Sequence, residues 1–341
     1  MKFLIAGLGS IGRRHLRNLI ALGEKDIVLL RSHRATLPDD ELAGYPVETN
    51  LAEALKKHKP VAVVVANPTS LHLDVAIPAA EAGCHMLLEK PVSHSLDRLD
   101  ELQKAAEKSG SRILVGFQFR YHPMLNKARE LIQAGALGKV LTVHAHWGEY
   151  LPNWHPWEDY RQSYAARADL GGGVIVTLTH PLDYLRFIIG DVDSLWSFNG
   201  HLSPLELDVE DVAEIGLRFS NGAIGGVHIN YFQRPPVHQL EIVGTGGTLR
   251  WDNTDGVLYS YRMPAEFGDY SANPPAPVIE TFSPPQGFER NQLFILQTKH
   301  FIELVHGEVQ PVCSLNDGVR VMKLVSAVQE SQKYGRVISL L

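Results

Sequence analysis

The sequence has few cysteines and no long uninterrupted run of apolar residues. Its 341 residues include only two cysteines, Cys84 and Cys313. Two thiols cannot build a disulfide framework or a four-thiolate zinc site, and a reducing compartment suits them better. No apolar run approaches the ~20 residues that a membrane-spanning helix needs. The apolar segment 1–6 is cut short by glycines, which indicates a first strand rather than a signal peptide. We therefore expect a cytoplasmic protein without a membrane partner.

An excess of basic charge is also absent. The chain has 32 Lys and Arg residues against 38 Asp and Glu residues, a formal net charge of −6. Nucleic-acid binding normally needs a basic face, so no nucleic-acid partner is expected. At roughly 150 residues per domain, the length predicts two domains, each large enough to bury a core without disulfides or metal.

The first 120 residues alternate short apolar segments with helical patterns. The segments expected to be strands are 3–6, 27–30, 61–66, 85–88 and 113–116. Continuous apolar runs of this length are typical of parallel strands buried on both faces. A helix is expected after Ser95, with Leu96, Leu99, Leu102 and Ala105 on one stripe and its end at Gly110. The pattern predicts an α/β domain over 1–120 with a doubly wound parallel sheet.

The pattern changes after residue 120. Pro123 is expected to open a helix that ends near Gly135, and longer strands are expected at 139–150, 209–219, 223–232, 240–243 and 257–262. Ser220-Asn221-Gly222 predicts a hairpin turn. The proline-rich segment 264–285 is expected to be a long loop, followed by helices near 291–306 and 315–334. The region 121–341 is therefore predicted to be an α+β domain with a large, mostly antiparallel sheet.

A glycine-rich turn directly follows the first predicted strand. It reads Gly7-Leu8-Gly9-Ser10-Ile11-Gly12 and leads into a helical pattern. In such a turn the first glycine allows the bend, the second lets the backbone approach a pyrophosphate, and the third lets helix and strand pack closely. The helix N-terminus adds N–H donors and a positive dipole end. The strand–turn–helix context predicts a dinucleotide-binding site.

The choice between NAD and NADP is read near the end of the second strand. An NAD-selective site usually has Asp or Glu there, but residues 29–34 contain no carboxylate. They contain Arg31 and Ser32, and a guanidinium matches a phosphate in charge and geometry. The alternative is that both residues are part of a solvated loop. We favour NADP as the cofactor and keep NAD open.

Two further segments carry groups suited to acid–base chemistry. Glu89 and Lys90 follow a predicted parallel strand, at the edge where open α/β sheets bind ligands. The second segment runs from Asp169 through three glycines to His180. Hydride transfer from a carbinol carbon needs a base for the hydroxyl proton and a positive group for the developing oxyanion. Helical spacing predicts one shared face for Thr177, His180, Asp183 and Tyr184, where Asp183 would orient His180 or raise its basicity.

These motifs resemble the glucose–fructose oxidoreductase, inositol dehydrogenase and rhizopine-catabolism family, written Gfo/Idh/MocA. The resemblance covers essentially the whole chain. It rests on the glycine turn, residues 67–72 (Asn-Pro-Thr-Ser-Leu-His), Glu89-Lys90-Pro91, residues 116–123 (Gly-Phe-Gln-Phe-Arg-Tyr-His-Pro) and the glycine run before His180. Each motif alone is loose, whereas all five in this order are specific.

The resemblance implies NAD(P)-dependent oxidation or reduction at a hydroxyl or carbonyl carbon of a sugar, sugar derivative or cyclitol. It implies that Lys90 contacts the reacting oxygen and that His180 takes or returns its proton. It also implies a Rossmann domain followed by a broad open sheet that serves oligomer contacts, so a homodimer or homotetramer is expected. Many family members carry an aspartate one turn before the histidine, whereas this chain has Val176 and Thr177 there.

Further site residues are expected around these groups. Those expected at the cofactor, besides the glycine turn, Arg31 and Ser32, are Asn67, Pro68, Thr69, His72, Glu89 and Lys90. Those expected at the substrate are Lys90, Arg120, His122, Tyr150, Trp154, Arg161, Tyr164, Thr177 and His180. Core or hinge roles remain open for Arg120 and His122, and a packed loop or subunit contact remains open for 150–164. His144 and His146 alternate on a strand, but spacing places no third ligand, so no metal is expected.

Three other functions remain open on the sequence alone. The first is an enzyme whose tightly held cofactor is reduced and reoxidised in one cycle, giving net epimerisation, hydrolysis or exchange between substrates. The second is an NADP-sensing protein without catalysis. The third is a scaffold that keeps the fold and binds no dinucleotide.

Overall fold

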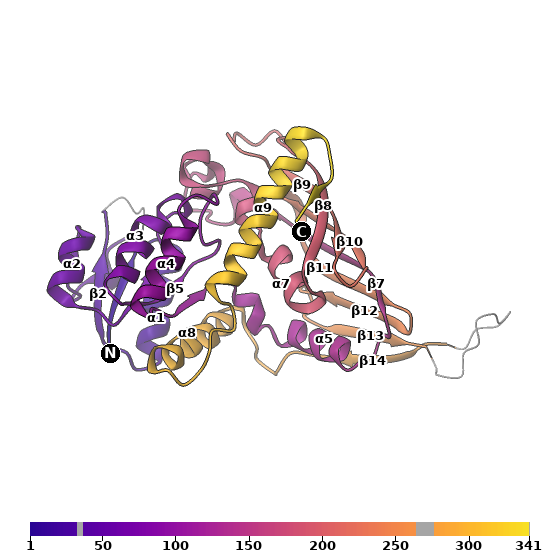
Figure 1. Cartoon of the computed structure of the whole chain (residues 1–341), viewed down its shortest axis with the longest axis horizontal. Coiled ribbons are helices and arrows are strands. Elements are labelled where there is room, and N and C mark those ends of the chain that lie inside the picture. Colours follow the sequence, from indigo (N-terminus) through magenta and orange to yellow (C-terminus); the bar gives the residue numbers. More distant parts are fainter. Residues whose placement is uncertain (33–36, 264–275, 341) are drawn as a thin grey trace. The chain divides into compact units, whose positions relative to one another are not determined.

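The computed structural model describes residues 1–32, 37–263 and 276–340, which divide into two compact units (Figure 1). Unit 1 comprises Met1–Gln118, Gln162–Gly172 and Glu289–Lys323. Unit 2 comprises Phe119–Arg161, Gly173–Phe288 and Leu324–Leu341, as far as these residues are described. Two segments that are distant in sequence from the N-terminal region thus fold with unit 1. They are Gln162–Gly172 and Glu289–Lys323.

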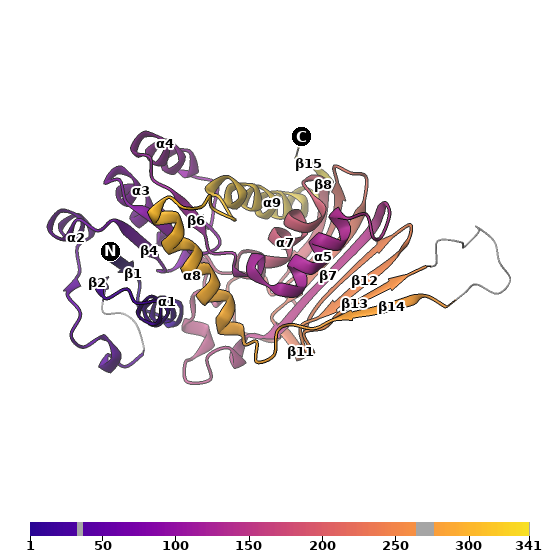
Figure 2. The same ribbon diagram turned by 90° about the horizontal axis from the view of Figure 1, so that it is seen from below.

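Unit 1 contains a six-stranded parallel sheet in the order β3-β2-β1-β4-β5-β6. Its strands are β1 (Lys2–Ala6), β2 (Asp26–Leu30), β3 (Val47–Glu48), β4 (Ala62–Val65), β5 (His85–Leu88) and β6 (Ile113–Val115). Its helices are α1 (Ser10–Ala21), α2 (Leu51–His58), α3 (His72–Glu81), α4 (Leu99–Ser109) and α8 (Arg290–His306). Helices α2, α3 and α4 lie on one face and α1 and α8 on the other (Figure 2). The predicted doubly wound sheet is confirmed, and the two-residue strand β3 is an addition.

Helix α4 begins later than the hydrophobic stripe predicts. The Ser95 hydroxyl accepts a hydrogen bond from the Asp97 backbone N–H at 3.2 Å, and this local turn competes with helix formation. The helix starts only at Leu99, and Leu96 stays exposed outside it. Its buried face consists of Leu99, Leu102 and Ala106. The predicted end is confirmed, since Gly110 adopts the left-handed conformation that terminates the helix.

Unit 2 contains a nine-stranded sheet in the order β14-β13-β12-β11-β7-β10-β9-β8-β15. Its strands are β7 (Val140–Tyr150), β8 (Val192–Gly200), β9 (Val212–Phe219), β10 (Ile224–Asn230), β11 (Phe232–Gly244), β12 (Gly247–Asp252), β13 (Leu258–Arg262), β14 (Val278–Phe282) and β15 (Ile338–Ser339). Among the described strands of this sheet, only β7 and β10 pair in parallel, so the predicted mostly antiparallel sheet is confirmed. Helices α5 (Pro123–Gln133) and α7 (His180–Ile189) lie on one face of it (Figure 2).

The structure corrects several strand assignments in unit 2. Strand β11 is far longer than 240–243, because a register irregularity between Phe232 and Val237 accommodates Pro235 and Pro236. The segment predicted as a loop contains β14, which pairs antiparallel with β13; residues 264–275 of that segment lie outside the described residues. The hairpin at Ser220–Gly222 is confirmed between β9 and β10. Helix α9 (Leu315–Tyr334) runs over the predicted residues.

The burial of the two cysteines and the character of the helices bear on the environment of the protein. Cys84 and Cys313 are both buried, and burial raises the pKa of the Cys84 thiol to about 11. Within the described residues, no helix combines the length and the apolar character needed to cross a bilayer.

Candidate active site

The three glycines of the first turn have different surroundings. A Cβ on Gly7, whose φ is +93°, would lie 2.5 Å from the Asn67 backbone nitrogen, and one on Gly12 would collide with the Gly7 carbonyl. A Cβ on Gly9 would meet nothing within 4 Å. Gly9 precedes α1, whose N-terminus has no side-chain cap and no acidic residue in its first turn. Gly9 and Ser10 are exposed. This backbone suits a pyrophosphate, which needs free approach and N–H donors.

Arg31 follows β2 directly, as expected, but a carboxylate is already bound to it. Its Nη2 lies 2.9 Å from Oδ1 of Asp39. Residues 29–34 contain no carboxylate, but the fold brings Asp39, from the 37–41 segment, to the end of β2. Ser32 is exposed beside Arg31.

His72 and Glu89 brace the turns beneath the expected cofactor site. The two ring nitrogens of His72 lie 2.9 Å from the Pro91 carbonyl and 3.0 Å from the Asn67 carbonyl, so the ring links the turns after β4 and β5. His15 of α1 donates from Nε2 to Glu89 at 2.7 Å. His72, Glu89 and His15 are all buried. The polar atoms of His72 and Glu89 thus make contacts within the protein, and the cofactor contacts expected of both residues stay predictions.

Burial and charge act differently on these groups. Burial lowers the pKa of His72, although the Glu89 charge acts in the opposite direction. The lowered pKa favours a neutral ring. Burial by itself would raise the pKa of Glu89, but the hydrogen bond from His15 and the charges of His15 and Lys90 lower it below its usual value. Glu89 is therefore held as a carboxylate next to Lys90, whose backbone N–H donates to it at 3.2 Å. Lys90 itself is half-buried at the end of this braced turn.

The residues after β4 show two kinds of placement. Pro68 and Asn67 are half-buried, and Asn67 donates from its side chain to the Leu71 carbonyl at 2.9 Å. Thr69 is buried, because Gly171 packs on it: a Cβ on Gly171 would lie 3.2 Å from the Thr69 Cβ and 2.7 Å from the His94 Cβ. The glycine run thus packs over the turn that is expected to contact the cofactor.

The other two glycines of this run are equally restricted. A Cβ on Gly172 would collide with the carbonyls of the 164–167 segment. Gly173 has a φ of +106° and packs on the carboxylate of Glu210. Glu210 also accepts hydrogen bonds from the first N–H groups of α6 (Val174–Thr177): its carbonyl from Val174 at 3.0 Å and its Oε1 from Ile175 at 3.1 Å. Burial raises the pKa of Glu210. No signal in the sequence pointed to Glu210.

His180 is the first residue of α7 and lies in an aromatic environment. Its ring stacks on Trp147 at a centroid distance of 5.3 Å and meets the edge of Phe119 at 5.0 Å. The side chain is buried. Thr177 is also buried, but it ends α6, and residues 178–179 interrupt the helix before His180. The expectation that Thr177 shares a helical face with His180 is therefore wrong, whereas His180, Asp183 and Tyr184 do belong to one helix.

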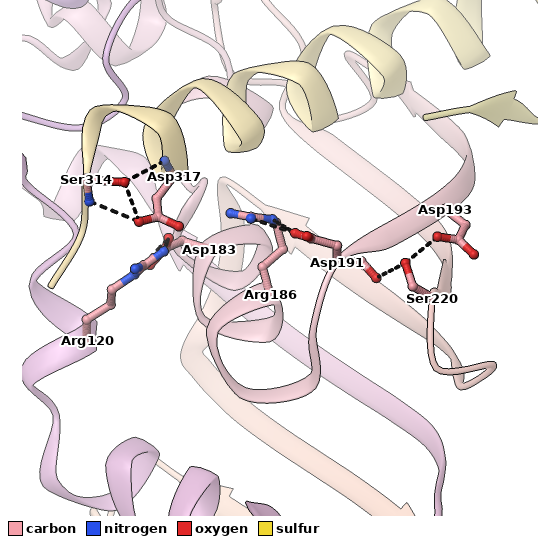
Figure 3. Close-up of polar contacts among 8 residues, drawn as sticks. All are labelled: Arg120, Asp183, Arg186, Asp191, Asp193, Ser220, Ser314 and Asp317. Carbon is pink, nitrogen blue, oxygen red and sulfur yellow. Dashed lines mark hydrogen bonds and ion pairs between the residues drawn. The ribbon is translucent and has the colours of Figure 1, made fainter. Parts of the chain in front are cut away.

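Asp183 is paired with Arg120 (Figure 3). Arg120 donates from Nε to both carboxylate oxygens, at 3.1 and 3.0 Å, and from Nη2 to Oδ1 at 2.7 Å. Both side chains are buried, and Arg120 also lies over the Phe187 ring. Such a bidentate pair holds both groups in fixed orientation. Arg120 therefore supports α7 from within unit 2, which agrees with the core role that the sequence left open.

His122 caps a helix in the core of unit 2, and its expected contact with the substrate stays a prediction. Its Nδ1 accepts a hydrogen bond from the Met124 N–H at 3.2 Å, at the start of α5. Its ring lies among Phe119, Trp251 and Phe288. Burial lowers the pKa of His122 to about 4, so the ring is neutral at pH 7.

The segment predicted to grip the substrate is divided between the two units. In unit 2, Tyr150 lies under the Arg234 guanidinium, and Trp154 packs edge-on against Tyr231. Arg161 binds two carboxylates, Asp159 at 2.8 Å and Glu206 at 2.7 Å. An anionic substrate group would have to approach this guanidinium beside two carboxylates of like charge.

Tyr164 lies in the part of the segment that folds with unit 1. It exposes 37% of its surface, while packing raises the pKa of its hydroxyl to about 12, with a further contribution from the Glu89 charge. Its hydroxyl is therefore a proton donor, not a phenolate, at neutral pH. Within the described part of the chain, no three His, Cys, Asp or Glu side chains gather as metal ligands.

Comparisons with known proteins agree with this architecture. Residues 1–117 match the model of the oxidoreductase family with an NAD-binding Rossmann fold, and residues 125–250 match that of the GFO/IDH/MocA C-terminal domain. The chain belongs to the Gfo/Idh/MocA family of oxidoreductases. As in that family, unit 1 of this Gfo/Idh/MocA oxidoreductase carries the NAD(P)-binding fold.

Individual relatives of this Gfo/Idh/MocA oxidoreductase act on sugars and cyclitols. It is 26% identical over 348 residues to D-xylose 1-dehydrogenase (NADP(+)) 2 of Haloferax volcanii, covering 100% of both chains. It is 24% identical to myo-inositol 2-dehydrogenase of Thermotoga maritima, covering 100% of this chain and 98% of that one. The solved structure of levoglucosan dehydrogenase in complex with NADH has the same fold, with a TM-score of 0.85 at 20% identity over 100% and 99% of the two chains.

Proposed function

We propose that this protein oxidises a carbinol carbon, or reduces the matching carbonyl, of a sugar, sugar derivative or cyclitol with NADP(H) or NAD(H). The observation that carries the proposal is the braced turn after β5. His72 and Glu89 hold the backbone on either side of Lys90, so the ammonium group is presented from a rigid edge of the dinucleotide-binding sheet. Open α/β sheets bind their ligands at this edge.

The residues of unit 1 fit a dinucleotide on structural grounds. The space beside Gly9 and the uncapped N-terminus of α1 suit a pyrophosphate. When bound, the nicotinamide accepts or returns the hydride. The chain's own residues then have two tasks: to hold the substrate oxygen and to move its proton.

We assign these tasks to Lys90 and His180. The Lys90 ammonium donates a hydrogen bond to the reacting oxygen and stabilises negative charge that develops on it. His180 takes the hydroxyl proton during oxidation and returns it during reduction, since imidazole changes protonation near neutral pH. Asp183 is a positioning residue, because both of its oxygens are engaged by Arg120. Substrate contacts from Tyr150, Trp154, Arg161, Tyr164 and Thr177 stay predictions.

The experiment is a spectroscopic assay of NAD(P)H formation with a panel of aldoses, anhydrosugars and cyclitols, on Lys90→Met and His180→Ala. We expect each variant to lose about 10²- to 10⁴-fold in kcat. Dinucleotide affinity of His180→Ala should stay unchanged. Lys25→Met and His144→Ala are the matched controls, because they make the same substitutions at exposed residues. Full activity of Lys90→Met and His180→Ala on a confirmed substrate would refute the assignment. Product formation without net NAD(P)H change would indicate internal recycling of the cofactor instead.

We also propose a homodimer or homotetramer, in a cytoplasmic compartment that keeps Cys84 and Cys313 reduced. One face of the large sheet exposes Trp196 and Phe198 on β8 and Ile224 on β10, with Phe198 69% exposed. A second copy of the chain would cover this apolar surface. Light scattering after size-exclusion chromatography tests it: Phe198→Arg should shift the mass toward the monomer, and a monomeric wild-type protein would refute the proposal.

A further inference from the structure

We propose that Asp39 controls the choice between NADP and NAD by occupying Arg31, the guanidinium that a 2′-phosphate would need. The inference deepens the proposed function and rests on dinucleotide binding by unit 1. It concerns a residue outside the glycine turn and outside the segment in which cofactor choice is normally read from sequence.

Arg31 lies where this fold contacts the adenosine ribose of a dinucleotide. It follows the last residue of β2, and its backbone N–H donates to the Glu48 carbonyl at 3.0 Å. Its side chain is only 7% exposed, and its Nη2 contacts Asp39 at 2.9 Å. Its Nε is buried and meets no acceptor among residues 1–32, 37–263 and 276–340. The guanidinium therefore has one carboxylate partner and one further buried N–H.

Asp39 is held in this place by Arg13, a buried residue of α1. Arg13 donates from Nε to the Leu8 carbonyl at 2.9 Å, inside the glycine turn. Its Nη2 donates to the Leu37 carbonyl at 3.0 Å and lies 3.5 Å from Asp39. One arginine thus ties the glycine turn to the segment that carries Asp39, so Asp39 is part of a built structure next to the expected phosphate-binding backbone.

A second carboxylate anchors the same segment without touching Arg31. Glu41 pairs with Nη1 of Arg13 at 3.0 Å and with Nε of Arg17 at 2.8 Å. Burial would raise the pKa of Glu41, but the hydrogen bonds from Arg17 and Arg13 lower it. Glu41 and the Arg13 contact with the Leu37 carbonyl therefore anchor the segment independently of Asp39.

The position of Asp39 has opposite consequences for the two dinucleotides. A 2′-phosphate carries a charge of about −2 at the end of β2. There it must compete for Arg31 with the carboxylate of Asp39, which has the same sign of charge. The 2′-hydroxyl of NAD brings no charge and meets no such repulsion. Asp39 is 58% exposed, so its carboxylate is a removable partner, not a buried structural one. We infer that Asp39 weakens NADP binding while leaving NAD binding unchanged.

The test is a double-mutant cycle on dinucleotide affinity, measured by isothermal titration calorimetry with NADP⁺ and NAD⁺ in the absence of substrate. Asp39→Asn should lower the Kd for NADP⁺ by about tenfold, the size of one charge–charge contact near a protein surface. The Kd for NAD⁺ should change less than about twofold. In an Arg31→Ala background the same substitution should produce no gain, because the partner it releases is missing.

Asp40→Asn is the matched control, since it removes the same charge from the next residue of the same segment. It should leave the ratio of the two affinities unchanged. Equal gains from Asp39→Asn and Asp40→Asn would overturn the inference in favour of a general charge effect. A gain that persists without Arg31 would overturn it as well.

Two further outcomes separate this inference from the proposed function. If Asp39→Asn weakens NAD⁺ and leaves NADP⁺ unchanged, Asp39 accepts hydrogen bonds from the ribose hydroxyls, and the inference fails while dinucleotide binding stands. If neither dinucleotide binds the folded wild-type protein, the proposed function fails and the inference with it. Thermal melting of every variant checks that the fold is retained.

Discussion

Inside unit 2, Arg120 donates hydrogen bonds to both carboxylate oxygens of Asp183. Asp183 lies three residues after His180 on the same helix. The two side chains are 4% and 1% exposed, and the shortest of their contacts is 2.7 Å. This pair connects the segment that follows β6 to α7. The orientation of the helix that begins with His180 is therefore set by a buried ion pair whose members lie more than 60 residues apart.

Breaking this pair should destabilise the protein more than breaking its neighbour on α7. Asp183→Ala leaves the Arg120 guanidinium buried without its carboxylate, and we expect a loss of about 3–5 kcal/mol in the free energy of unfolding. Arg186→Ala removes the pair with Asp191 (Figure 3). Because the Asp191 side chain is half-exposed, the free energy of unfolding should fall by about 1 kcal/mol or less. Urea denaturation measures both. Equal losses would show that burial does not decide the strength of these pairs.

The first two glycines of the dinucleotide turn should respond differently to a methyl group. Gly9 has an ordinary φ of −74° and free space around it, so Gly9→Ala should fold normally. It should nevertheless raise the Kd for NAD(P)⁺ by at least about tenfold, because the methyl group stands where the pyrophosphate approaches. Gly7→Ala combines a positive φ with a backbone clash and should lose more than about 2 kcal/mol of stability. Loss of stability in Gly9→Ala with intact binding would contradict this division.

The stability of unit 2 should depend on pH through His122. Its pKa is about 4 in the folded protein, because of burial, and near 6.5 in the unfolded chain. Between these values the unfolded state binds more protons, so the free energy of unfolding falls as the pH is lowered from 6.5 to 4. The shift corresponds to roughly 3 kcal/mol over that range. Above pH 6.5 this residue contributes no slope.

Urea denaturation at several pH values, with His122→Asn as the comparison, isolates this contribution. Asparagine retains an oxygen that can cap α5 but does not titrate. We expect the variant to be less stable at pH 7, since it loses aromatic packing, and to have a flatter pH dependence between 4 and 6.5. An unchanged slope would assign the effect to another group.

Gly173 should tolerate alanine less well than another glycine with a positive φ. Gly190→Ala introduces the same type of backbone strain in open space, at an expected cost of about 1–2 kcal/mol. Gly173→Ala adds a collision with the Glu210 carboxylate that caps α6. We expect a larger loss of stability and a lower kcat, because α6 leads into His180. Calorimetric melting and steady-state kinetics of the two variants test this. Identical behaviour would show that the collision with Glu210 affects neither stability nor kcat.

Much of the local structure follows from the sequence. The apolar runs of unit 1 predicted all its strands except β3, because strands buried on both faces must be continuously apolar. Gly110 and Gly222 ended a helix and shaped a hairpin as expected, since both need a positive φ. Strands β8, β12, β14 and β15 were missed. Their half-buried alternation is weak, and their pairing partners, not their own residues, define them.

The candidate site shows where sequence reasoning ended. It proposed the glycine turn, Lys90 and His180 as one site, through motifs that are local in the chain, and this assignment stays a prediction. It did not find that Glu89 and His72 are turned inward as braces, that Arg120 holds Asp183, or that Asp39 reaches Arg31. Each of these depends on two side chains brought together across many residues. Local pattern therefore determined the secondary structure and the chemical groups available, while burial and charge pairing, which exist only in the folded chain, decided which groups stay available to a ligand.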